Sequence, residues 1–91
     1  MNWICEFTAD AAKDLRSLPR PIQKRVARTL DQMAADPFQG NVKAMRGSEW
    51  KGVFRRRIGS YRLLFTVHVE GEEKKVFTVL RILLRSEDTY K

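Results

Sequence analysis

The sequence is poor in the residues that form disulfides, metal sites and thiol-based active sites. It contains one cysteine, Cys5, and one histidine, His68. A lone cysteine cannot form an internal disulfide, and no CxxC pair or Cys/His cluster is present to bind zinc. We therefore expect no metal, no cofactor and no cysteine–histidine catalytic pair.

Long apolar runs are also absent. No stretch approaches the ~20 residues that a membrane-spanning helix requires. The opening residues, MNWICEF, lack the basic and apolar regions of a signal peptide. The simplest expectation is a cytoplasmic protein that does not span a membrane.

Acidic residues are outnumbered, with 11 Asp and Glu against 18 Lys and Arg, so the net charge is +7. This excess indicates a polyanionic partner such as RNA, DNA, an acidic protein or an anionic membrane surface. Because the charge is clustered, a basic surface without a function is the weaker interpretation. A chain of 91 residues predicts a single domain, residues 1–91, with one modest core.

The first half of the chain predicts a strand followed by two helices. The alternation of NWICEF, residues 2–7, is typical of a strand. Thr8 is a suitable N-cap for a short helix, which the sequence LPRP (residues 18–21) then ends. Apolar residues spaced at helical intervals predict a second helix over residues 21–35.

The second half changes to a two-residue period and predicts three strands, over residues 53–58, 61–70 and 75–83. The order is β-α-α-β-β-β. We expect an α+β fold in which the two adjacent helices pack on one face of a small, twisted, mainly antiparallel sheet. The other face would be partly open and available for a site.

Four arginines lie around the turn at Gly59-Ser60, in the sequence FRRRIGSYRLLF. Strand alternation places Arg55, Arg57 and Arg62 on the open face, while Arg56 points to the opposite side. Such close like charges are destabilising without an anion, and natural proteins tolerate this conflict mainly at functional sites. The alternative is a solvated strand face on which arginine stems cover apolar surface.

The motif G-x-F-R-x-R-x-G-x-Y-R-L-L-F, residues 52–65, resembles the central hairpin of the RelE/ParE toxin superfamily. The flanking segments are similar to other parts of that family: residues 7–37 to its opening helical hairpin, 41–50 to its K-x-L-x-G segment, and 79–91 to its closing strand and R-x(4–5)-Y tail. The resemblance covers nearly the whole chain. It implies a RelE-like toxin of a type II toxin–antitoxin module.

The hairpin and tail look closer to the RelE branch, whose members cleave mRNA in the ribosomal A site. The resemblance implies a metal-independent endoribonuclease in which the ribose 2′-OH attacks the adjacent phosphate, so that translation is inhibited. It also implies partners, namely the ribosome, mRNA and a cognate antitoxin that is often acidic and partly disordered when free.

The same resemblance assigns the site residues. Arg55 and Arg57 match the branch's two basic strand residues, Arg62 and Arg85 would bind the phosphate and the transition state, and Tyr90 would stack on a base or orient the 2′-OH. Arginine stays protonated at ordinary pH, so the cluster is better described as an electrostatic clamp than as an acid–base pair.

We also expect Lys43, Lys51 and Arg56 to contact RNA. His68 lies six residues beyond Arg62 on the same strand, ~20 Å away at ~3.3 Å per residue, which is too far to join the arginine cluster. Trp3 and Trp50 have two interpretations, as packing residues or as platforms for bases, and packing is the more common role.

Two other functions remain open. A ParE-type toxin would inhibit DNA gyrase, and a non-catalytic basic module would bind nucleic acid without cleaving it. Cleavage of translated mRNA distinguishes the first hypothesis from both.

Overall fold

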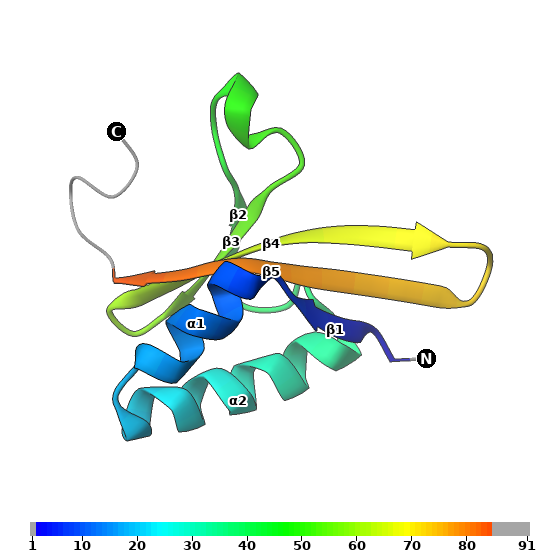
Figure 1. The fold of residues 1–91 in the computed structure, drawn as a ribbon. Coiled ribbons are helices and arrows are strands. Elements are labelled where there is room, and N and C mark those ends of the chain that lie inside the picture. The colour runs from blue at the N-terminus through cyan, green and yellow to red at the C-terminus, as the bar shows by residue number, and fades with distance from the viewer. Residues whose placement is uncertain (1, 85–91) are drawn as a thin grey trace.

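The computed structural model describes residues 2–84 of the chain. Its elements follow the predicted order, with a short strand and a 3-10 helix inserted before the central hairpin (Figure 1). The elements are β1 (Ile4–Phe7), α1 (Ala9–Ser17), α2 (Arg20–Ala35), β2 (Val42–Ala44), the 3-10 helix η1 (Ser48–Trp50), β3 (Phe54–Ile58), β4 (Tyr61–Glu70) and β5 (Lys74–Leu84).

The strands form a five-stranded sheet in the order β1-β5-β4-β3-β2. β1 pairs in parallel with β5, and the other neighbours are antiparallel. Both helices lie on the same side of this sheet (Figure 1). The predicted α+β fold, with two helices on a mainly antiparallel sheet, is therefore confirmed.

The helices begin and end where the local sequence predicts. The side chain of Thr8 caps α1 by accepting a hydrogen bond from the Ala11 N–H at 3.0 Å. α2 begins one residue earlier than predicted, at Arg20, and Pro21 occupies its first turn, where a missing N–H costs nothing. Asp36 ends α2 because the proline that follows it disfavours a helical conformation.

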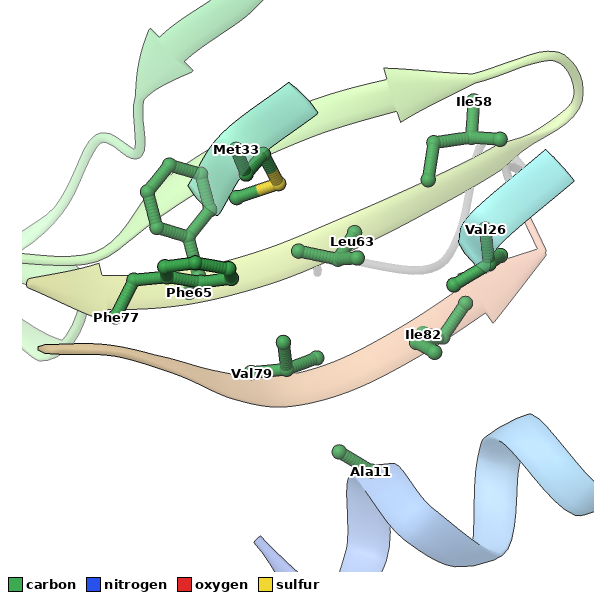
Figure 2. Packing of buried hydrophobic residues seen from close by; sticks show 9 residues of the cluster. All are labelled: Ala11, Val26, Met33, Ile58, Leu63, Phe65, Phe77, Val79 and Ile82. Atoms are coloured by element: carbon green, nitrogen blue, oxygen red, sulfur yellow. The ribbon is translucent and has the colours of Figure 1, made fainter. Parts of the chain in front are cut away.

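One hydrophobic core fills the space between the helices and the sheet (Figure 2). Leu63 and Phe65 of β4 are fully buried at its centre, against Val26 and Met33 of α2. The rings of Phe65 and Phe77 meet edge to face, with their centroids 6.4 Å apart. This core fixes the face of β4 that turns toward the helices.

A β-bulge interrupts the pairing of β4 with β5. Leu64 pairs with Arg81 and Phe65 with Val79, which leaves Leu80 as the extra residue. The Thr8 hydroxyl donates a 2.8 Å hydrogen bond to the carbonyl of Leu80. Thr8 thus caps α1 and at the same time joins it to the irregular part of β5.

Beyond the end of β1, α1 lies along the edge of β5. The Asp14 carboxylate accepts hydrogen bonds from Arg81 at 2.7 and 3.2 Å, and from the backbone N–H of Ile82 at 2.9 Å. Burial alone would raise the pKa of Asp14, but the hydrogen bonds from Arg81 and Ile82 outweigh it and lower that pKa below its ordinary value. The charged carboxylate therefore stabilises the packing of α1.

None of the helices formed by residues 2–84 is both long enough and apolar enough to cross a membrane.

Replacing Asp14 with Asn should reduce the free energy of unfolding by about 1 kcal/mol at pH 7, because the ionic hydrogen bonds to a partly exposed Arg81 are lost. Since the folded-state pKa of Asp14 is depressed, its contribution is complete above the unfolded value of ~3.9 and is lost as the pH falls through the folded-state value. Urea denaturation from pH 7 to pH 2 measures this. A difference between the two proteins that does not shrink in acid would contradict the assignment.

Burial, reinforced by the neighbouring Glu6, raises the pKa of the Cys5 thiol to about 11. Because the thiolate is the reactive form, Cys5 should react at pH 8 at least ~10-fold more slowly with a disulfide reagent in the folded protein than in the guanidinium-unfolded protein. Equal rates for the two states would show that the thiol is neither shielded nor shifted.

Candidate functional site

Arg55, Arg57 and Arg62 are brought together by the hairpin of β3 and β4. In the register of the two strands, Arg57 pairs directly with Arg62, and Arg55 lies two residues before Arg57 in β3. Because Ile58 and Leu63 of the same strands point into the core, these arginines lie on the face of the sheet away from the helices. Alternation thus gives the cluster that the sequence predicts.

The cluster surrounds a pocket of about 230 Å³ to which β2 also contributes. Lys43 pairs with Arg55, and the carbonyl of Asn41 accepts a hydrogen bond from the Arg57 N–H at 3.2 Å. The residues that line the pocket are Asn41, Lys43, Arg55, Arg57 and Arg62. Asn41 is not among the site residues predicted from the sequence, because a three-residue strand gives too little alternation to place its neighbours.

A second hollow, of about 450 Å³, adjoins the first and shares three of its residues, Lys43, Arg55 and Arg62. Its other lining residues are mostly apolar or aromatic, in contrast to those of the first pocket. They are Ala44, Met45 and Trp50, together with one further arginine, Arg46.

Arg56 points to the helix side of the sheet and takes no part in either hollow. Its guanidinium donates to the carbonyl of Gln39 and, at 3.1 Å, to the side-chain oxygen of Gln32 at the end of α2. It also lies over Gly40, where a Cβ atom would come within 2.8 Å of the Arg56 Nη1 atom. Arg56 therefore connects β3 to the segment that follows α2.

Of the other candidate residues, Lys51 and His68 do not line either hollow. Lys51 is exposed just after η1. Arg85 and Tyr90 fall outside the described residues. His68 lies at the distal end of β4, where its Nε2 atom is 3.3 Å from a carboxylate oxygen of Glu70.

The chemistry of the first pocket is that of an anion site. Within residues 2–84, none of the residues that line it is acidic. Two pairs of like charges, Arg57 with Arg62 and Lys43 with Arg55, face each other across neighbouring strands. Directly opposed like charges destabilise a sheet, and a bound anion would reduce that repulsion. Guanidinium groups bind phosphate oxygens in pairs, so the pocket is suited to a phosphate group.

A cation site of the usual kind is not formed by this part of the chain. Within residues 2–84, no three His, Cys, Asp or Glu side chains are grouped so that they could hold a metal ion.

The sequence matches a family model described as the ParE toxin of type II toxin–antitoxin system, parDE, over residues 5–89. No curated protein sequence matches the chain.

Several solved structures have a similar fold. One is the RelBE2 toxin–antitoxin complex from Mycobacterium tuberculosis, with a TM-score of 0.78 and 28% identity over 93% of this chain and 100% of that chain. The archaeal RelE–RelB complex from Pyrococcus horikoshii has a TM-score of 0.75 and 24% identity, over 96% of this chain and 99% of that one. A YoeB/ParE toxin from Agrobacterium tumefaciens has a TM-score of 0.76 and 16% identity, over 91% of this chain and 99% of that one.

The anion pocket can be tested with sulfate as a probe. Sulfate should raise the melting temperature of the protein by mass action, beyond the effect of sodium chloride at equal ionic strength. Arg57→Gln removes one donor, so its sulfate-dependent rise should be about half that of the unaltered protein.

The matched control is Arg16→Gln, which removes the same charge from the exposed end of α1. This variant should keep the full response to sulfate. The pocket is not a specific anion site if the two variants respond equally.

Proposed function

The chain belongs to the ParE toxin family of type II toxin–antitoxin systems and has a RelE-like fold, and from this premise we propose that it inhibits translation by cleaving messenger RNA on the ribosome. The observation that carries the proposal is the pocket formed by Asn41, Lys43, Arg55, Arg57 and Arg62. The four cationic side chains around this pocket are opposite in charge to an RNA phosphate and to the more negative transition state of its cleavage.

In the proposed reaction, the ribose 2′-OH attacks the adjacent phosphorus and the 5′ oxygen of the next nucleotide leaves. Negative charge builds up on the non-bridging phosphate oxygens as the phosphorane forms. Arg57 and Arg62 face each other across the hairpin and would hold these oxygens from two sides, while Arg55 and Lys43 add charge from the adjoining positions. Donors fixed in advance lower the barrier because they need no reorganisation during the reaction.

Proton transfer requires a different group. Arginine is a poor general acid or base because its pKa lies far above neutral. The three arginines of the pocket therefore supply charge stabilisation. Another group must take the proton of the 2′-OH, and a proton must also be donated to the 5′ oxygen as it leaves. Arg85 and Tyr90 remain the predicted additional members of the site, as the resemblance to the RelE branch implies.

We further propose that the chain binds a cognate antitoxin. The similar structures from M. tuberculosis and P. horikoshii are both toxin–antitoxin complexes. A net charge of +7 favours an acidic partner segment, because complementary charge speeds association and suppresses wrong partners. Such a segment would inhibit the toxin if it covered or rearranged the arginine pocket.

The second candidate function is inhibition of DNA gyrase. The observation that favours it is the family match itself, since the matching model describes the ParE toxin. A gyrase inhibitor would induce the DNA-damage response and leave translated mRNA intact. The arginine pocket supports mRNA cleavage more directly, because its chemistry addresses a phosphate.

The decisive measurement is primer extension on a transcript translated in the presence of the toxin. The unaltered protein should cut the message within codons and only when ribosomes are present. Arg62→Gln should lower the cleavage rate about 100-fold, which is typical for the loss of one preorganised donor to a developing oxyanion.

Arg16→Gln serves as the charge-matched control and should cleave at the unaltered rate. Circular dichroism and thermal melting establish that both variants are folded. Equal cleavage by the two variants would exclude Arg62 from the site, and a DNA-damage response without cleavage would favour gyrase inhibition.

A further inference from the structure

The second hollow differs from the anion pocket in a way that matches the two halves of a nucleotide. Among residues 2–84, those that line the first pocket are all polar or charged. The second begins at the shared residues Lys43, Arg55 and Arg62 and then continues to an apolar wall. A nucleotide has the same division, with a charged phosphate joined through the sugar to a flat base whose two faces stack on aromatic rings.

The apolar wall is formed by Ala44, Met45 and Trp50. Trp50 is half-buried, and the indole ring is the largest of the aromatic surfaces on which bases stack in proteins that bind single-stranded nucleic acid. Arg46 adds a guanidinium, which can also stack on a base or pair with a neighbouring phosphate.

Backbone hydrogen bonds hold this wall in place. The Met45 N–H donates to the carbonyl of Val53, and the Val53 N–H donates to the carbonyl of Trp50, both at 2.9 Å. The Trp50 N–H in turn donates to the carbonyl of Gly47 at 3.1 Å, in a turn that requires the positive φ of 102° at Gly47. The loop that carries Trp50 is therefore closed by hydrogen bonds between the end of β2, which carries Lys43, and the start of β3, which carries Arg55 and Arg57.

We propose that the second hollow is a nucleobase subsite, in which Trp50 stacks on the base of the nucleotide whose phosphate occupies the arginine pocket. The inference rests on the proposed function only in taking RNA as the ligand. Because stacking does not require hydrogen bonds to base edges, the subsite accepts any base and prefers those with the larger ring.

Adenosine 5′-monophosphate, ribose 5-phosphate and inorganic phosphate separate the contributions of base, sugar and phosphate. In a Trp3→Phe background, Trp50 is the only tryptophan and reports on its own surroundings. Adenosine 5′-monophosphate should quench its fluorescence saturably, whereas ribose 5-phosphate, which has no base, should not.

A further variant tests the wall by thermal shift. Trp50→Leu should weaken adenosine 5′-monophosphate about tenfold, toward the affinity of ribose 5-phosphate, and leave inorganic phosphate unchanged. The fluorescence comparison keeps Trp50 in place, so it remains a valid test where Trp50→Leu does not fold.

Arg57→Gln is the opposite control, because it should weaken all three ligands. The proposal is overturned if ribose 5-phosphate quenches Trp50 as strongly as the nucleotide does, or if folded Trp50→Leu binds the nucleotide with full affinity; Trp50 is then a packing residue. These readouts need no ribosome, so the subsite can fail while mRNA is cleaved, and it can be confirmed even if mRNA is not cleaved.

Discussion

The burial of Leu63 and Phe65 against the two helices determines the direction of every side chain in the central hairpin. A strand alternates strictly, so fixing these two residues in the core sends Arg62 to the other face. The cross-strand register then brings Arg57 opposite Arg62. The position of the charged site is thus a consequence of apolar packing on the reverse side of the same sheet.

The features predicted correctly are those with a strong periodic signal. The apolar stripe of α2 and the alternation of β3 and β4 extend over enough residues to settle both the type of element and its buried face. The grouping of Arg55, Arg57 and Arg62 followed from that alternation and from a two-residue turn. The family resemblance supplied the functional expectation, which periodicity alone could not provide.

The features that were missed depend on tertiary contacts. β2 spans only Val42–Ala44, so its alternation is too short to recognise before its partner strand is known. The extra residue Leu80 in β5 is visible only as a shift in register. Arg56 is an arginine where alternation calls for an apolar residue, and the reason appears only in the fold, where Gln32 of α2 lies within reach of its guanidinium.

The contact between Asp14 and β5 also bears on self-association. Past the end of β1, the edge of β5 would otherwise have unpaired backbone donors. Exposed sheet edges of this kind can pair with strands of other molecules. The Asp14 carboxylate accepts the hydrogen bond of the Ile82 N–H, and its ion pair with Arg81 places charged groups at this edge. This contact thereby protects the edge of β5 from pairing with a strand of another molecule, which is the first step toward larger assemblies.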